Sequence, residues 1–371
     1  MSLRLRRGRG ILPILVILGV LGYWWIHSRP VKVLAVAYVS DRNLTIWNAL
    51  AQVQHPVAVL QYGERVEILA ENGEAARLRT AGGVEGWLPN SGSLMDPALW
   101  KKSTDLLARA RTLPVQARGQ TKTITNVRIE PGLTGSRIFQ FGRGTPIVVL
   151  ERAAVALHAS LAPASDRNPD EAGSGNKAPM PRREDWFLVL SSANNANQTG
   201  PLQPNAATTP NPASGNPVIG GDSLEFGETR GKRARPIAVA GWVLGRFVEL
   251  EPPAPVNDYA ASNGMRVVAW FPLNHVPDGS GGEVPQYLVA GIKGDEGQVC
   301  DFTMLRVYTW STVRQRYETA YIENDLCGRL PIRVSQSPMG PEFQFEEAGP
   351  DTGSKRYVLR GTMVRRIRHS K

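Results

Sequence analysis

Apolar and polar residues alternate along much of the chain, which is the pattern of half-buried antiparallel β-strands. In residues 57–89 the apolar positions Val66, Ile68 and Leu78 recur with this period, and a glycine-bearing turn separates the runs. A similar order of short apolar runs and turns returns between residues 126 and 243. The pattern therefore predicts a mainly β protein that contains two related small units.

The last part of the chain, residues 256–371, has a strand series of its own. We predict an antiparallel β domain here, either a sandwich or a sheet like one propeller blade. An aromatic stripe on one face fits either a core or a recognition surface. The expected strands are 264–271, 286–293, 300–310, 316–322, 330–334, 342–346 and 356–368. The stripe consists of Phe302, Met304, Arg306, Tyr308 and Trp310, followed by Tyr317, Thr319 and Tyr321.

Residues 96–113 interrupt the β pattern with a helical period. Asp96 can cap this helix, Pro97 suits its first turn, and Pro114 prevents it from continuing. We predict a linker helix that either packs on a β unit or binds lipid or a partner through its basic side. The residues expected on its packing face are Leu99, Ser103, Leu106, Leu107 and Ala110.

The chain begins with a basic segment, residues 1–10, that carries four arginines and no acid. An uninterrupted apolar run at residues 11–26 follows within the segment 11–29, and Tyr23, Trp24 and Trp25 lie near the end of the run. The run and its aromatic residues favour a transmembrane signal anchor, and the arginines favour a cytoplasmic N-terminus. A cleaved signal peptide and a buried helix are the alternatives. As an anchor, it would make a single-pass protein of the inner (cytoplasmic) membrane, with the bulk of the chain extracytoplasmic or periplasmic.

Several short motifs, in a fixed order, resemble those of bacterial SH3 (SH3b) domains. In the first unit they are YGERVEIL at 62–69 and GWL at 86–88; in the second they are NVR at 126–128, PG at 131–132, FGRGTPIVVL at 141–150, DWFLV at 185–189 and GWV at 241–243. The first copy is degenerate, because LTIW at 44–47 replaces NVR, and Ala75 and Ala76 lack the aromatic that precedes the fourth strand.

The resemblance covers residues 35–250 and implies two SH3-like small barrels, domain 1 at 33–95 and domain 2 at 115–252. Two segments poor in apolar residues interrupt the second copy, at about 159–183 and 191–236, and we predict that both are disordered insertions. SH3b domains are modules that dock onto cell-wall peptides, glycan or protein partners and carry no catalytic residues of their own. The chain is therefore expected to bind rather than to catalyse.

The aromatic residues that follow glycine in the closing strands have two interpretations. Trp87 and Trp242 either cover the open end of a small barrel or line a shallow peptide or glycan groove. The candidate ligand groove consists of Trp47, Tyr62, Trp87, Asn126, Arg128, Trp186 and Trp242.

The distribution of charged residues along the chain limits the classes of binding partner that we expect. The net charge is +10, but residues 1–10 and 355–371 hold eleven basic residues and no acid, which leaves the body of the chain near neutral. Nucleic-acid binding needs basic residues clustered along one face, so none is expected here. The basic tail could attract anionic lipid, wall polymer or a protein partner.

The two cysteines of the chain, Cys300 and Cys327, fall in the last domain. In an oxidising compartment they can pair, and otherwise they are two small buried thiols. Metal binding is not expected, because no CxxC or HxxxH spacing accompanies them.

Two motifs resemble catalytic sites, but each lacks the histidine base that catalysis would need. Residues 221–224 read GDSL, the nucleophile motif of one hydrolase class, but no histidine of the chain has an aspartate three positions before it. A thiol peptidase would need a histidine base after its cysteine, and only His369, in the basic tail, follows Cys300 and Cys327.

We therefore expect a non-enzymatic, membrane-anchored binding or scaffolding protein for peptidoglycan, wall peptides or an envelope protein, with no cofactor and no small-molecule substrate. The alternative is an accessory subunit or cryptic hydrolase of cell-wall remodelling.

Overall fold

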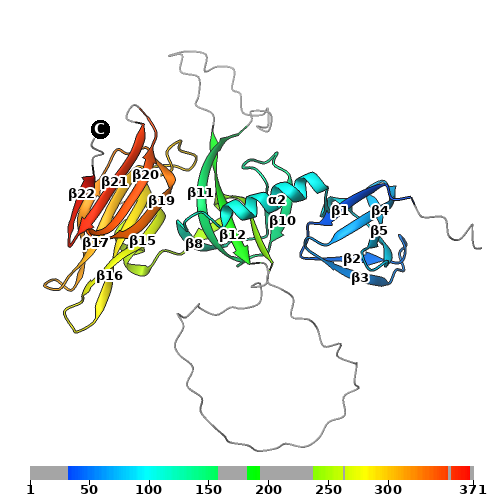
Figure 1. The fold of residues 1–371 in the computed structure, drawn as a ribbon, viewed down its shortest axis with the longest axis horizontal. Coiled ribbons are helices and arrows are strands. Elements are labelled where there is room, and N and C mark those ends of the chain that lie inside the picture. The colour runs from blue at the N-terminus through cyan, green and yellow to red at the C-terminus, as the bar shows by residue number, and fades with distance from the viewer. Residues whose placement is uncertain (1–31, 158–181, 193–236, 262–263, 350–351, 368–371) are drawn as a thin grey trace, which may run out of the picture. The chain divides into compact units, whose positions relative to one another are not determined.

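The computed structural model describes residues 32–157, 182–192, 237–261, 264–349 and 352–367. Within these residues the protein is mainly β, with four antiparallel sheets, as the alternating pattern predicts (Figure 1). The chain divides into two compact units, Met1–Pro97 and Ala98–Lys371. The first unit contains one of the sheets and the second unit contains the other three.

The first sheet has seven strands in the order β3-β2-β6-β5-β4-β1-β7. The predicted alternation fixes which side chains it buries: Val66 and Ile68 of β4 and Leu78 of β5 face inward and join one hydrophobic core with Ile46. The strands are β1 (Ala35–Val39), β2 (Asn43–Trp47), β3 (Pro56–Gln61), β4 (Arg65–Asn72), β5 (Ala75–Thr80), β6 (Glu85–Leu88) and β7 (Leu94–Met95), with the 3-10 helix η1 (Ser91–Ser93) before β7.

The second sheet repeats this topology. Its order, β10-β9-β13-β12-β11-β8-β14, is that of the first sheet with every strand number raised by seven. The elements are β8 (Ala117–Thr121), β9 (Thr125–Arg128), β10 (Arg137–Phe141), β11 (Pro146–Ala156), β12 (Arg183–Ser192), β13 (Ala238–Leu244), the 3-10 helix η4 (Gly245–Phe247) and β14 (Val248–Leu250).

The repeat extends to single residue pairs. Trp47 of β2 lies opposite Trp87 of β6, and Arg128 of β9 lies opposite Trp242 of β13 in the same place of the second sheet. Glycine precedes both tryptophans because the strands approach closely there. A Cβ atom added at Gly241 would lie 2.5 Å from Val127 Cγ1. The repeated Gly-Trp pairs therefore mark equivalent positions of two topologically matching sheets.

Helix α2 (Pro97–Ala110) packs on an outer face of the second sheet (Figure 1). Leu106, Leu107 and Ala110, three of the residues predicted for its packing face, contact a cluster that includes Leu188 and Leu190 of β12. The helix is thus a packed spacer, the first of the two interpretations. Glu151 of β11 adds an ion pair with Arg109, at 2.5 Å.

The equivalent face of the first sheet is charged. Cross-strand register makes Leu188 and Leu190 equivalent to Arg77 and Arg79 of β5. These two arginines form ion pairs with Glu85 and Glu67, at 2.9 and 2.8 Å. An apolar helix face packs on leucine and would leave arginine desolvated, so the composition of the two faces explains why α2 packs on the second sheet.

The C-terminal strands form two four-stranded sheets, with the orders β15-β16-β17-β18 and β19-β20-β21-β22. Leu288 and Val307 of the third sheet and Ile332 and Phe343 of the fourth sheet lie in one core, so the two sheets pack as a sandwich. The strands are β15 (Arg266–Pro277), β16 (Glu283–Ile292), β17 (Met304–Ser311), β18 (Arg316–Glu323), β19 (Gly328–Ser337), β20 (Gly340–Glu347), β21 (Gly353–Arg360) and β22 (Met363–Ile367).

Two details of the predicted C-terminal strands are wrong. The expected strand 356–368 is two strands, because Gly361 adopts a φ of +59° and reverses the chain between β21 and β22. Phe302 does not share a face with Met304 and Tyr308: it precedes β17 and its ring lies in the core between the sheets.

The aromatic stripe is largely a second core. Met304, Tyr308 and Tyr317 pack beneath helix α3 (Ala254–Ala261), which contributes Val256 and Ala260. The side chains of Tyr308 and Tyr317 are buried as a result. The core interpretation therefore describes these positions.

A buried arginine joins the second sheet to the sandwich. Arg152 of β11 has a fully buried side chain, and its Nη2 donates to Asp185 Oδ1 of β12 at 2.5 Å. Its Nη1 donates to Asp301 Oδ1, at 3.1 Å, in the segment before β17. Arg266 of β15 reaches Asp185 Oδ2 at 3.1 Å. We call these four residues the Arg152 cluster.

Backbone groups complete this joint. Arg152 also donates to the carbonyl oxygens of Gln298 and Cys300, both at 3.0 Å. Nearby, the buried amide of Gln116 donates to the Ile332 carbonyl and accepts from the Ile332 N–H, at 3.1 and 2.8 Å. Burial raises the pKa of Asp301, although Arg152 and Arg329 oppose this change.

Cys300 and Cys327 form a disulfide, with Cα atoms 4.8 Å apart. The predicted anchor at 11–29 lies outside the described residues, as do most of the predicted insertions 159–183 and 191–236. Arg183 and Ser191, at the edges of those insertions, belong to strand β12. In the part of the chain that the structure describes, no helix is long and apolar enough to cross a bilayer.

Candidate functional site

Three residues of the predicted ligand groove line one hollow of the second sheet. Asn126 and Arg128 of β9 and Trp186 of β12 border a groove of about 190 Å³. We call it the Arg128 groove. Its other lining residues are Ile124, Thr125, Leu133, Gln140, Leu244, Arg246 and Phe247.

The remaining predicted residues lie elsewhere. Trp47 and Trp87 are half-buried and face each other across β2 and β6 in the first unit, where Tyr62 is also half-buried. Trp242 is only 8% exposed and belongs to the core beneath helix α2, so it covers the sheet and does not line the Arg128 groove. The sequence left both interpretations of Trp242 open, and burial supports the core one.

Local sequence explains how the polar side chains of the groove are presented. In β9, Thr125 and Val127 are buried, and the alternation turns Asn126 and Arg128 toward the other side. Asn126 lies opposite Gln140 of the edge strand β10, and Gln140 Nε2 donates to Asn126 Oδ1 at 3.1 Å. Two amide groups therefore lie side by side on the groove wall with hydrogen-bonding capacity to spare.

Two guanidinium groups make the groove electropositive. Arg128 donates to the Gly135 carbonyl through Nη1, and burial lowers the pKa of its guanidinium. Arg246 of η4 lies over the Phe247 ring at 5.2 Å and forms an ion pair with Glu184 at 3.3 Å. Arg128 has no carboxylate partner among the described residues, so it is the cation of the groove that is free to bind a carboxylate.

Apolar side chains flank these polar groups. Ile124 and Leu133 are exposed by 62% and 45%, and the buried Trp186 also lines the groove. An arginine between exposed apolar side chains suits a peptide that carries both a carboxylate and an aliphatic group. The lining residues supply a guanidinium, two amide groups and apolar surface for contact with a ligand.

Seven lining residues of the groove were not predicted from the sequence: Ile124, Thr125, Leu133, Gln140, Leu244, Arg246 and Phe247. Arg246 and Phe247 directly follow the Gly-Trp-Val landmark at 241–243, and this nearness could have drawn attention to them. Leu133 and Gln140 reach the groove only through the pairing of β9 with β10, which the sequence does not show.

Comparison of the chain with models of known protein families, with curated proteins and with solved structures finds no match. The site therefore has to be interpreted from its own geometry. Among the described residues, no three or more His, Cys, Asp or Glu side chains come together as metal ligands.

Proposed function

We propose that this chain is a membrane-anchored, non-enzymatic binding or scaffolding protein that engages peptidoglycan, wall peptides or an envelope protein partner. In this proposal each seven-stranded sheet closes into an SH3b-like small barrel, and residues 11–29 hold the protein in the inner membrane. The observation that carries the proposal is the grouping around one groove of Asn126 and Arg128, from the landmark at 126–128, and Trp186, from the landmark at 185–189.

The chemistry of the groove favours a carboxylate-bearing peptide. Arg128 offers a guanidinium without a carboxylate partner among the described residues, and a charged hydrogen bond from it would be stronger than a neutral one. Ile124 and Leu133 provide exposed apolar surface in the same groove for small aliphatic side chains. Cell-wall peptides combine free carboxylates with alanine side chains, so they match both features.

Two further observations support this assignment. The matching strand orders of the two sheets are what a tandem binding module would have. The disulfide between Cys300 and Cys327 favours an oxidising compartment, such as the periplasm, for the C-terminal domain.

Co-sedimentation of the purified full chain with isolated sacculi tests the proposal. We expect retention by the wild type and about tenfold weaker retention by Arg128→Met, because the variant loses a charge-assisted hydrogen bond. Arg118→Met is the matched control, since Arg118 is exposed on β8 and does not line the groove. Equal retention of the two variants, or clearing of the sacculi in a zymogram, would contradict the proposal.

A further inference from the structure

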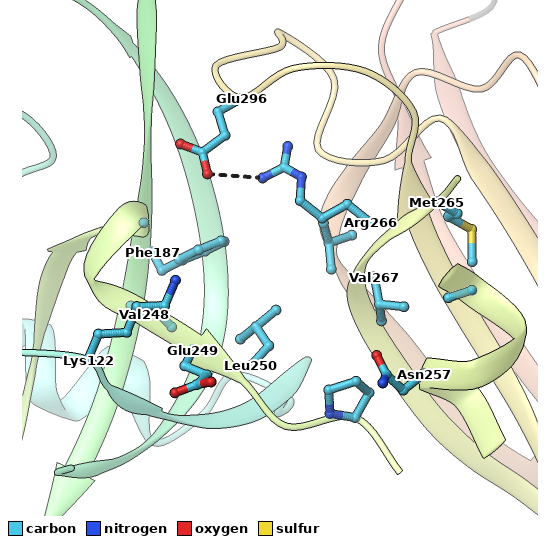
Figure 2. Close-up of a pocket in the computed structure, with 14 residues that line it drawn as sticks. Lys122, Phe187, Val248, Glu249, Leu250, Asn257, Met265, Arg266, Val267 and Glu296 are labelled. Atoms are coloured by element: carbon cyan, nitrogen blue, oxygen red, sulfur yellow. Dashed lines mark ion pairs between the residues drawn. The ribbon is translucent and has the colours of Figure 1, made fainter. Parts of the chain in front are cut away.

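A second hollow lies at the joint between the second sheet and the sandwich, within the unit Ala98–Lys371 (Figure 2). It has a volume of about 350 Å³ and shares no lining residue with the Arg128 groove. Lys122, Phe187, Val248 and Glu249 border it from the second sheet, and Arg266 borders it from β15. We call it the joint cleft.

The walls of the joint cleft are apolar at their base. Phe187 and Val248 come from the second sheet, and Val268 and Met265 come from the opposite side. All four side chains are largely buried, with exposures between 2% and 6%. A cleft of this volume with an apolar floor falls at the lower end of the range of small-ligand sites, about 300 to 1,000 Å³.

Charged side chains of both signs surround this floor. Lys122 and Glu249 are exposed, and neither forms an ion pair or a side-chain hydrogen bond among the described residues. Arg266 and Glu296 lie together at another part of the rim, 3.9 Å apart (Figure 2). Arg266 is neutralised further by Asp185, so Lys122 is the most available cation.

The Arg152 cluster binds two segments that line the cleft. Asp185 binds Arg152 on one side and Arg266 on the other, and it also accepts the N–H of Gly297, at 2.8 Å, beside Glu296. The buried carboxylate thereby fixes the strand that carries Arg266 and the loop that carries Glu296. A preformed cleft loses less free energy on ordering when a ligand binds.

We propose that the joint cleft binds a short peptide with both termini free. The peptide carboxylate pairs with Lys122, its ammonium group pairs with Glu249 or Glu296, and an aliphatic side chain contacts the Phe187 floor. The balance of two cations and two anions fits a zwitterion better than a polyanion such as a nucleotide, which Glu249 and Glu296 would repel. This site does not depend on the function proposed for the Arg128 groove.

Calorimetric titration of the full chain with the tripeptide Ala-Leu-Ala tests the proposal. We expect saturable binding, and about tenfold weaker binding of the N-acetylated and of the C-amidated tripeptide, because each cap removes one charge. Lys122→Met should lower the affinity by a similar factor. Lys102→Met, at an exposed position of α2, is the matched control and should leave the affinity unchanged.

Three outcomes would overturn the proposal. One is equal affinity for capped and uncapped peptides, which would remove the role of the termini. The second is Lys122→Met binding like the wild type, and the third is no binding by the wild type at all. Arg128→Met separates the two sites, since it should bind Ala-Leu-Ala like the wild type even if it no longer binds sacculi.

Discussion

Arg152 and Asp185 form a fully buried ion pair, with Arg152 Nη2 at 2.5 Å from Asp185 Oδ1. Asp301 completes the site from a segment that lies 149 residues further along the chain. Among the described residues, loss of Arg152 would leave two buried carboxylates with only the partly exposed Arg266 and Arg329 as cationic partners. Two parts of the second unit are therefore joined by a contact that tolerates little change.

Arg152→Met should lower the free energy of unfolding by about 3 to 5 kcal/mol, because Asp185 and Asp301 would remain buried with less compensation. Denaturant unfolding of the two proteins measures the difference. Arg109→Met removes the exposed ion pair with Glu151 by the same substitution and should cost about 1 kcal/mol or less. Similar losses in the two variants would mean that the Arg152 cluster contributes no more than a surface contact.

The closing glycines of the two sheets should respond differently to alanine. At Gly241 the new Cβ would meet Val127 Cγ1 at 2.5 Å and the Arg128 carbonyl oxygen at 2.8 Å, whereas at Gly86 the nearest atom is Ile46 Cδ1, at 3.0 Å. Gly241→Ala should therefore destabilise by roughly 1 to 3 kcal/mol, and Gly86→Ala by less. Thermal unfolding of both variants provides the comparison, and the reverse order would contradict the register assigned to β13.

Removal of the disulfide should lower the stability of the second unit and leave that of the first unit unchanged. Cys300 and Cys327 are separated by 27 residues, and a loop of this size corresponds to about 3.5 kcal/mol of chain entropy in the unfolded state. Its loss also frees the segment whose Cys300 carbonyl accepts from Arg152. Limited proteolysis should cut residues 264–349 faster in the Cys300→Ala, Cys327→Ala double variant than in the wild type. Equal rates of cleavage there would argue against this.

Alkaline pH should destabilise the sandwich through Tyr317. Burial, reinforced by the neighbouring Tyr287, raises the pKa of Tyr317 to about 12. An unfolded tyrosine has a pKa of about 10, so between these values the unfolded state releases a proton that the folded state retains. The free energy of unfolding should then fall by roughly 1.4 kcal/mol per pH unit for this group.

Tyr317→Phe isolates this effect, although it also loses the hydrogen bond to the Pro285 carbonyl, at 2.9 Å. The loss of this hydrogen bond lowers the free energy of unfolding equally at every pH below the pKa of folded Tyr317. Urea unfolding at about pH 9 and at about pH 11.5 should show a smaller decrease for Tyr317→Phe than for the wild type. Identical decreases would assign the alkaline sensitivity to other groups.

Features that depend on local pattern could be predicted from the sequence. Alternation identified the β class and the inward residues Val66, Ile68 and Leu78, and the proline and leucine spacing identified helix α2. Asn126 was a candidate because it belongs to a short ordered motif. In each case the information lies within about ten residues of the chain.

Features that depend on distant pairing could not be predicted. Arg152 looks like the polar end of a strand, and only the arrival of Asp301 and the Cys300 carbonyl shows that its side chain is buried. The contrast between Leu188 and Arg77, which decides where α2 packs, becomes visible only when both sheets are aligned by register. The joint cleft likewise forms between the second sheet and the sandwich, and its lining residues lie far apart in the sequence.

The most direct test of the proposed function is site-specific photocrosslinking in living cells, with a benzophenone amino acid at Leu133 of the Arg128 groove. A second protein with the same amino acid at Val313, which is 91% exposed and distant from the groove lining in sequence, is the control. We expect adducts with wall fragments or one envelope protein at position 133, and their loss on Arg128→Met. Adducts of equal yield at both positions, or none at position 133, would contradict it.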